Sequence, residues 1–307
     1  MKKKNNWIKI FVLAFLVLTL SGCTTVLKDK DKKTIKNPNT GQNITKNVLC
    51  KPTDEAILEI YEEKKVDITA LPKCENIKLA GKYEGLWENI FVKPLAYVIV
   101  KLGNVFNSTA LALITVTLVI RLLLSPVTKK TAAQSENLKL AKPALDSIEA
   151  KYKDKTDEVS VQKKTQETMA VYKKHGINPF SSCLFAIIQF PLLFAFLEAI
   201  NRVPAIFEEK FLIFQMGTTP SHGLTTGNYQ YLILLGLVVL TTYLSFKMNK
   251  ATTNPDTESQ MKYMLPVMVG VITLTSFSLP AATAIYWITS SGFTMIQNLI
   301  TDRKSKK

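Results

Sequence analysis

One stretch near the C-terminus constrains the fold of this 307-residue chain more than any other feature. From Tyr263 to Ile300, 38 consecutive residues include no Asp, Glu, Lys, Arg or His. At 1.5 Å per residue a helix of that length would measure about 57 Å, nearly twice the ~30 Å hydrocarbon core of a bilayer. The stretch must therefore cross a membrane twice, and Leu279-Pro280 predicts the turn between the two spans. A soluble globular enzyme and a disordered or fibrous chain are both excluded.

Three more apolar stretches lie upstream, so we predict an all-α polytopic membrane protein with a bundle of five transmembrane helices. The predicted spans cover residues 106–127, 179–200, 229–246, 263–279 and 281–300. With their loops they form a predicted core over residues 104–301, which is followed by a basic tail at residues 302–307.

Apolar periodicity predicts two helical regions outside the spans. Residues 86–103 place apolar side chains at helical spacing and most charges elsewhere, which predicts an interfacial amphipathic helix that Pro94 bends or restarts. A soluble packing helix is the alternative. Residues 128–177 predict a hairpin of two antiparallel helices with a break at Asp154–Asp157, whose charges form either a solvated surface or a docking site for partners. Its two apolar stripes are Leu138, Ala141, Leu145, Ile148 and Tyr152, and then Val161, Thr165, Thr168 and Tyr172.

The N-terminus has the organisation of a signal peptide. Lys2, Lys3 and Lys4 form a positive region upstream of Ile10–Leu20, an 11-residue, largely apolar stretch that is too short for a comfortable span. It ends in Leu20-Ser21-Gly22-Cys23, which resembles the lipobox of bacterial lipoproteins. The resemblance implies that residues 1–22 are removed and that Cys23 is diacylated as the first mature residue, outside the membrane. An uncleaved signal anchor with an incidental Cys is the alternative.

The exported segment, residues 23–85, is predicted to be a tether with little structure. Residues 24–40 are rich in Lys, Thr, Asn and Asp and predict a flexible chain, and one short helix is expected over Glu55–Lys65. Cys50 and Cys74 could form a disulfide in this compartment, although a sequence cannot supply their separation. No Cys and His spacing predicts a metal site, so the only group expected is the diacylglycerol on Cys23.

Lysine and arginine in the loops predict the orientation. The segment 128–177 carries 11 Lys, and the loop Lys247–Lys262 carries three. The opposite loop, residues 201–228, has one Arg and one Lys, which two Glu offset. The hairpin, the second loop and the tail are therefore predicted to be cytoplasmic. The net charge of +15, from 39 Lys and Arg against 24 Asp and Glu, then faces the cytoplasm and anionic lipid rather than nucleic acid.

Arg121 is the residue that points to a function, because it is the only charge between Lys101 and Lys129. It lies about six residues, or ~9 Å, from the cytoplasmic end of its span. An Arg inside a bilayer costs ~2.5–3.5 kcal/mol on insertion scales, so something must offset that cost. Its side chain either reaches the cytoplasmic surface or faces a water-filled cavity.

Polar stripes on the other spans favour the cavity. The candidate groove residues are two sets at helical spacing and one residue in the middle of the second span: Thr117, Arg121 and Ser125; Tyr286, Ser290 and Gln297; and Gln189. Ordinary hydrogen bonding between membrane helices is the alternative, worth ~0.6 kcal/mol per contact. No acid lies deep in the predicted bundle, which suits transient capture of a carboxylate from another molecule better than a proton relay or an ion pump. No phosphate loop and no nucleophile–base pair is evident, so we do not expect an enzyme.

The order of several motifs resembles the YidC family of membrane protein insertases, in its lipoprotein-type bacterial form. These motifs are Ile120-Arg121-Leu122, Ser125-Pro126, Tyr172 to Pro179, Ile188-Gln189-Phe190-Pro191, Tyr263-Met264-Leu265-Pro266, Pro280, Tyr286-Trp287 and Gln297. The resemblance covers about residues 85–301. It implies a cell-membrane bundle with a groove open to cytoplasm and lipid, in which Arg121 attracts an acidic segment of a nascent membrane protein.

The resemblance also implies partners. Nascent membrane proteins would be the substrates, and the chain would act alone or beside the Sec translocon, in contact with membrane lipids. The hairpin would recruit substrate or partner. Only a short basic tail follows the last span, so strong ribosome tethering is not expected.

Two readings from other classes stay open on the sequence. A small-solute transporter or channel predicts an internal repeat and half-helices that bind the solute, and no convincing repeat is visible. A lipoprotein scaffold, whose bundle only anchors the exported segment, predicts tolerance of Arg121→Ala and sensitivity in residues 24–85.

Overall fold

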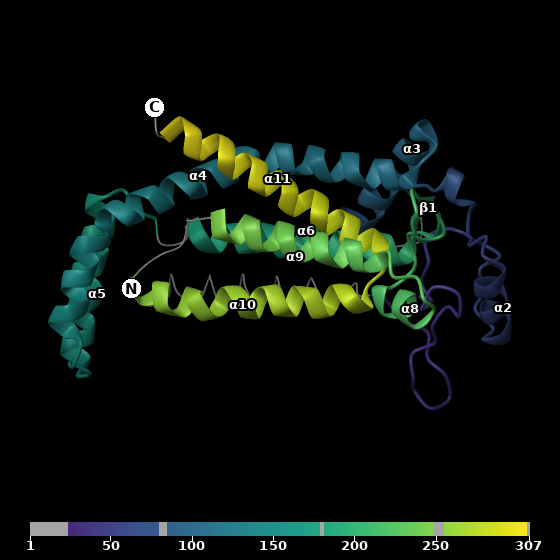
Figure 1. Ribbon diagram of the computed structural model, residues 1–307, viewed down its shortest axis with the longest axis horizontal. Coiled ribbons are helices and arrows are strands. Elements are labelled where there is room, and N and C mark those ends of the chain that lie inside the picture. The colour runs from purple at the N-terminus through teal and green to yellow at the C-terminus, as the bar shows by residue number, and fades with distance from the viewer. Residues whose placement is uncertain (1–23, 80–84, 179–180, 249–254, 306–307) are drawn as a thin grey trace. The chain divides into compact units, whose positions relative to one another are not determined.

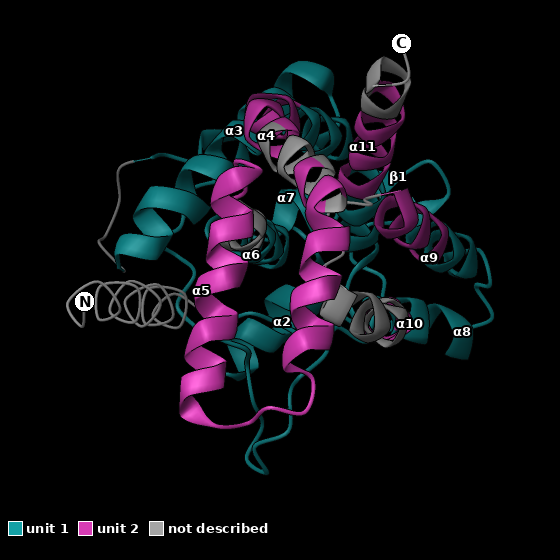
Figure 2. Cartoon of the chain, turned by 90° about the vertical axis from the view of Figure 1, so that its left-hand side faces the viewer, with its two compact units in different colours: residues 1–118, 190–238, 274–289 teal, residues 119–189, 239–273, 290–307 magenta. Residues whose placement is uncertain are grey.

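The computed structural model describes residues 24–79, 85–178, 181–248 and 255–305. Helices dominate this part of the chain, and one two-stranded hairpin accompanies them (Figure 1). The chain forms two compact units, which Figure 2 colours separately. Unit 1 comprises Met1–Leu118, Phe190–Val238 and Leu274–Thr289, and unit 2 comprises Val119–Gln189, Val239–Thr273 and Ser290–Lys307.

A long helix covers most of each predicted span. These helices are α4 (Thr109–Tyr152), α6 (Ser181–Arg202), α9 (Tyr231–Met248), α10 (Pro255–Ser278) and α11 (Ala281–Ser305). The first span is predicted to begin at residue 106, whereas the structure places a turn at residues 107–108, just before α4. The predicted turn at Leu279-Pro280 separates α10 from α11. Among the described residues, Glu88–Phe106, Thr109–Lys129 and Tyr231–Met248 are long and apolar enough to cross a membrane, and Pro266–Ser278 is apolar but shorter. The full set of five spans stays a prediction.

The predicted amphipathic helix begins with a π-helix, η2 (Glu88–Val92), and continues as α3 (Lys93–Phe106). Pro94 lies in the first turn of α3, directly after the π-helix, so the helix continues and changes from π to α at the proline. The helix is two-sided: one face is buried, whereas Phe91, Val98 and Val105 are exposed at seven-residue spacing. By length and composition this segment could also cross a membrane, so its interfacial position stays a prediction.

The turn from α3 into α4 is fixed by close packing. Asn107 ends α3 in the left-handed conformation (φ 52°), which Asn tolerates better than most residues. A Cβ on Gly103 would lie 2.6 Å from Cγ2 of Thr109. Only glycine lets the two helices approach this closely.

The expectation of a flexible tether over residues 24–40 is wrong. Short β-bridges pair Val26 with Thr45 and Lys36 with Asn43. The buried side chains gather around the expected short helix, α2 (Glu55–Glu63), in a core formed by Leu27, Ile44, Val48, Ile57, Tyr61 and Phe207. The polar composition misled the prediction because the apolar partner of this segment, Phe207, lies far along the chain and its contribution to the core is invisible locally.

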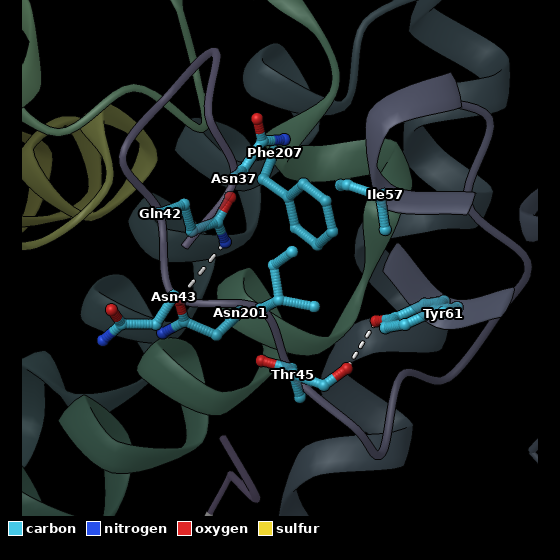
Figure 3. Close-up of a pocket in the computed structure, with 9 residues that line it drawn as sticks. Asn37, Gln42, Asn43, Thr45, Ile57, Tyr61, Asn201 and Phe207 are labelled. Carbon is cyan, nitrogen blue, oxygen red and sulfur yellow. Dashed lines mark hydrogen bonds between the residues drawn. The ribbon is translucent and has the colours of Figure 1, made fainter. Parts of the chain in front are cut away.

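Tyr61 is central to this small core. Its side chain is buried, and its hydroxyl donates a hydrogen bond to the carbonyl oxygen of Thr45 (Figure 3). Burial, with a smaller contribution from the charge of Glu208, raises the pKa of Tyr61 above its ordinary value. Polar side chains line a small pocket beside it, where the amide nitrogen of Gln42 lies 3.4 Å from the amide oxygen of Asn201.

A disulfide closes the same segment. It joins Cys50 to Cys74, whose Cα atoms lie 4.8 Å apart. Cys74 begins a single 3₁₀ turn, η1 (Cys74–Asn76), and the β-bridge between Lys51 and Lys73 runs beside the bond. Lys101 and Asn104 of α3 donate to the carbonyl of Glu75 at 3.1 and 3.3 Å. These two hydrogen bonds connect the disulfide-closed segment to α3.

In unit 2 the end of α4 and α5 (Glu158–Lys174) form the predicted two-helix hairpin, with the break at residues 153–157 (Figure 2). The first stripe is buried as its spacing predicts, at Ala141, Leu145, Ile148 and Tyr152, with Leu138 half-buried. The second stripe is partly wrong, because Val161 and Thr165 are exposed. Ion pairs join the two helices of the hairpin instead, at 2.7 Å between Lys151 and Glu167 and at 2.5 Å between Lys164 and Glu149.

Four small elements of unit 1 follow α6. They are α7 (Pro204–Phe207), β1 (Lys210–Phe211), β2 (Phe214–Gln215) and α8 (Pro220–Thr225). Strands β1 and β2 pair in antiparallel register, Lys210 with Gln215 and Phe211 with Phe214. The backbone N–H groups of Ala281 and Ala282 then donate to this loop at 2.9 Å, which ties the start of α11 to it.

Candidate functional site

The parts of α4 and α11 that belong to unit 2 meet through polar side chains. The guanidinium of Arg121 donates to the hydroxyl of Ser290. Two turns further along, the amide nitrogen of Gln297 donates to the hydroxyl of Ser125 at 3.0 Å and to that of Thr128 at 2.7 Å. Four residues singled out from the sequence, Arg121, Ser125, Ser290 and Gln297, therefore form one polar seam.

Helical spacing produces this seam. Positions 121, 125 and 128 are separated by four and three residues, as are 290, 294 and 297. Each set lies along one face of its helix, so two such faces in contact bring every polar pair into register. The hydroxyl of Thr294 donates to the backbone carbonyl of Ser290 at 3.0 Å, so the Thr294 side chain is satisfied within its own helix.

Arg121 is a buried cation in an apolar stretch. Only 8% of its surface is exposed. Residues 109–128 and 281–300 contain no Asp or Glu, so its neighbours along both helices are hydroxyls, an amide and apolar side chains. A guanidinium carries five N–H donors and holds its charge at any physiological pH. The polar seam therefore carries a fixed, buried positive charge in the middle of an apolar helical segment.

Two other candidate groove residues make contacts outside this seam. Thr117 belongs to unit 1 and donates its hydroxyl to the carbonyl of Leu113 at 2.7 Å, within its own helix. Tyr286, also in unit 1, stacks on Phe196 with ring centroids 4.3 Å apart. Gln189 is half-buried on α6. A role for these three in one groove stays a prediction.

Sequence reasoning missed a buried ionic cluster in unit 1. Arg202 is fully buried, and one of its nitrogens lies 3.0 Å from the carboxylate of Glu88 and 3.5 Å from that of Glu198. Trp87 donates to Glu198 at 2.9 Å, and Lys93 lies 3.3 Å from Glu88. The four charges sum to zero, which lowers the cost of burying them. Only the four-residue separation of Glu198 and Arg202 hinted at the cluster in the sequence.

Two adjacent glutamates were also missed, because they were counted only as an offset to nearby positive charge. Glu209 accepts from the backbone N–H of Thr109 at 2.6 Å and of Ala110 at 3.1 Å, and so caps the N-terminus of α4. Glu208 accepts from the backbone N–H groups of Thr53 and Asp54 just before α2. One dipeptide thus holds the starts of two helices.

No group of three or more His, Cys, Asp or Glu within the described ranges could hold a metal ion. The lipid site expected at Cys23 lies outside the described residues. What remains chemically is a fixed cation on a polar seam, beside surfaces rich in exposed apolar side chains. Such an arrangement can bind and release an anionic group without covalent chemistry.

The family model for the 60Kd inner membrane protein matches residues 101–307, two thirds of the chain. The chain belongs to this family. The resemblance to YidC seen in the sequence is therefore confirmed, and the protein is a bacterial membrane protein with several apolar helices.

Named relatives agree with this assignment. The chain is 36% identical over 246 residues to the membrane protein insertase YidC of Oceanobacillus iheyensis, covering 76% of this chain and 92% of that protein. It is 31% identical over 233 residues to the membrane protein insertase MisCA of Bacillus subtilis, covering 75% of this chain and 85% of that protein. These names describe insertion rather than an enzymatic reaction, in line with the expectation of a protein that is not an enzyme.

A solved structure of an active YidC insertase shares the fold. It superposes with a TM-score of 0.50 at 20% identity over 80% of this chain. The chain spans about half (51%) of that longer chain. At this identity the likeness extends to the fold of the family and no further.

Proposed function

We propose that this chain is a membrane protein insertase whose substrates are nascent membrane proteins. The observation that carries the proposal is the buried Arg121 on a polar seam, in a family whose relatives are named insertases. The seam is the cytoplasmic, lipid-accessible part of a hydrated groove, and Thr117, Gln189 and Tyr286 extend its polar lining.

Electrostatic attraction drives the capture of substrate. A carboxylate of the incoming segment 4 Å from Arg121, at an effective dielectric of about 20, gains ~4 kcal/mol before desolvation. Ser290 holds the guanidinium in place through its hydroxyl. The membrane potential then favours outward movement of the negative charge by ~2.3 kcal/mol per 100 mV.

Release into lipid needs no further energy source. The apolar helix of the substrate slides from the groove into the bilayer while its short polar end crosses. The groove shortens the polar path and thins the local membrane. No nucleotide and no covalent step take part.

The remaining parts of the chain serve this cycle. A diacylated Cys23 anchors residues 24–85 outside the membrane, and the α4–α5 hairpin recruits substrate from the cytoplasm. The protein acts alone or beside the Sec translocon on proteins with one or two spans.

Reconstitution in liposomes tests the role of Arg121. The substrate is a single-span protein with an acidic N-terminal tail, and insertion is read as protease protection of that tail. Arg121→Ala is expected to abolish protection, and Arg121→Lys to retain part of it because the charge remains. The matched control is a substrate whose tail acids are replaced by amides, for which the Ala variant should lose little relative to wild type.

Two outcomes would contradict the proposal in different ways. Full insertion of the acidic substrate by Arg121→Ala would remove Arg121 from the mechanism and leave insertion itself standing. Failure of the wild type, with a substrate that a known insertase inserts in parallel, would overturn the insertase function.

A further inference from the structure

An exposed apolar turn projects from the loop between α6 and α9. Leu212 and Ile213 connect β1 to β2, and they are 76% and 55% exposed. Exposed apolar side chains on a predicted transmembrane helix need no explanation, because lipid covers them. Leu212 and Ile213 lie on no helix, so their exposure to solvent requires a different explanation.

The backbone at this turn makes the choice of leucine unusual. The turn has two residues, and Leu212 has a positive φ of 54°. Two-residue turns with positive φ at the first position usually have glycine there, since a side chain at that position is strained. A large apolar side chain therefore occupies a position where local backbone energetics favour a small one.

The base of the turn is rigid. Phe214 is buried and meets the ring of Tyr231 edge-on at 5.7 Å. The Tyr231 hydroxyl accepts from the backbone N–H of Gln215 at 3.0 Å, and Gln215 donates to the Glu208 carbonyl at 3.0 Å. An apolar tip on a fixed base can dock on a surface without further ordering.

The tip is fastened next to the beginning of a candidate span. Glu209, three residues before Leu212, caps Thr109 and Ala110, where the span Thr109–Lys129 starts. Ser108, the residue just before that span, donates its hydroxyl to the same Glu209 carboxylate at 2.6 Å. Val105 and Phe106 at the end of α3 are 74% and 40% exposed. The tip and these residues therefore lie around the level where a bilayer would begin, and exposed Lys210 adds a positive charge beside them.

We infer that the Leu212–Ile213 turn inserts into the lipid interface beside the N-terminus of α4, with Lys210 near the phosphate groups. The occupant is phospholipid, because the exposed apolar tip is fastened through Glu209 to the start of a segment long enough to cross a membrane. The turn then holds the outer loop at a fixed depth. The inference needs only a membrane location and does not depend on the insertase function.

Depth-dependent quenching tests the inference on the full chain in phosphatidylethanolamine–phosphatidylglycerol vesicles. A fluorophore sensitive to polarity is attached at Leu212→Cys in a Cys183→Ser background. The matched control carries it at Thr225→Cys, an exposed position in the same loop. We expect a blue-shifted emission at 212, strong quenching by nitroxide lipids and weak quenching by iodide, with the reverse pattern at 225.

Three results would overturn the inference. The label at 212 could be as open to iodide as the label at 225, which would place the tip in water. Shielding that appears only with an added substrate protein would make the partner a protein, and shielding that grows with protein density in the vesicle would make it a second copy of the chain.

A second variant separates folding from lipid contact. Asn tolerates a positive φ, so Leu212→Asn should keep the turn and unfold in detergent at the same temperature as wild type. In vesicles, a fluorophore at Ile213→Cys should be quenched more strongly by iodide when Leu212→Asn is also present than when it is absent. Equal iodide quenching with and without Leu212→Asn would contradict the inference.

Discussion

Arg202 shows how one buried side chain can hold several segments together. It is fully buried, contacts Glu88 and Glu198, and donates from Nε to the carbonyl of Asn47 at 2.7 Å. The N-terminal segment that contains Asn47, η2 and α6 therefore share a single guanidinium. A charge that is satisfied at three points becomes costly to remove, because its partners stay buried.

We predict that Arg202→Met lowers the unfolding free energy by about 3–5 kcal/mol, since it leaves two buried carboxylates with less compensation. Thermal unfolding in detergent is the measurement. The control is Lys64→Met, which breaks the exposed pair with Glu63 and should cost under ~1 kcal/mol. Similar losses for both variants would mean that burial of the cluster adds nothing.

Tyr61 predicts a pH dependence of stability. Its pKa is raised above the ordinary 10.0 in the folded state, so stability is fully present below pH 10. Above that pH the unfolded chain releases the proton while the folded chain keeps it, and stability falls by ~1.4 kcal/mol per pH unit. Unfolding of wild type and Tyr61→Phe should be compared at pH 8 and pH 11. The Phe variant should lose less stability on this change, and equal losses would exclude Tyr61 as the titrating group.

Among the elements, the α4–α5 hairpin is the clearest case of a helix pair held by a narrow apolar seam. One face of α4 is buried, whereas no residue of α5 is fully buried. The ion pair with Lys151 holds the pKa of Glu167 below its usual range and raises that of Lys151, so the pair stays charged at neutral pH. Because that pair is solvent-exposed, the seam rather than the ion pair should hold the hairpin.

We therefore predict that Leu145→Ala opens the hairpin. Leu145 is 7% exposed, and its truncation should cost about 2 kcal/mol or more. Hydrogen exchange of the α5 amides is the measurement, and their protection should fall. Leu140→Ala is the matched control, because Leu140 is 68% exposed on the same helix. Equal protection in the two variants would show that α5 gains nothing from the seam.

For the molecule as a whole, charge distribution predicts the orientation in the membrane. Lys28 in the exported segment should face outward and Lys153 in the hairpin loop inward, because short lysine-rich loops stay cytoplasmic. Cys at either position, in a Cys183→Ser background, can be labelled in intact cells with an impermeant maleimide. Labelling at 28 and not at 153 is the expected result. The reverse pattern would invert the topology and place the hairpin outside.

Periodic features could be predicted from the sequence because they repeat within a few residues. The buried stripe from Ala141 to Tyr152 and the shared face of Arg121 and Ser125 follow from 3.6-residue spacing, and the turn at Leu279-Pro280 follows from a local proline signal in an apolar stretch too long for one span. The fold class and the family follow from the same local signals in their order along the chain. Such signals need no knowledge of distant residues.

Long-range partners could not be predicted, and they required the folded structure. Glu88 meets Arg202 across 114 residues, and Thr53 meets Glu208 across 155. The packing of residues 24–49 onto Phe207 is of the same kind, which is why a polar composition there predicted a tether wrongly. A charged residue or a polar segment has the same sequence whether it is exposed to water or packs against a complementary group. Its burial depends on a partner that only tertiary packing brings within hydrogen-bond distance.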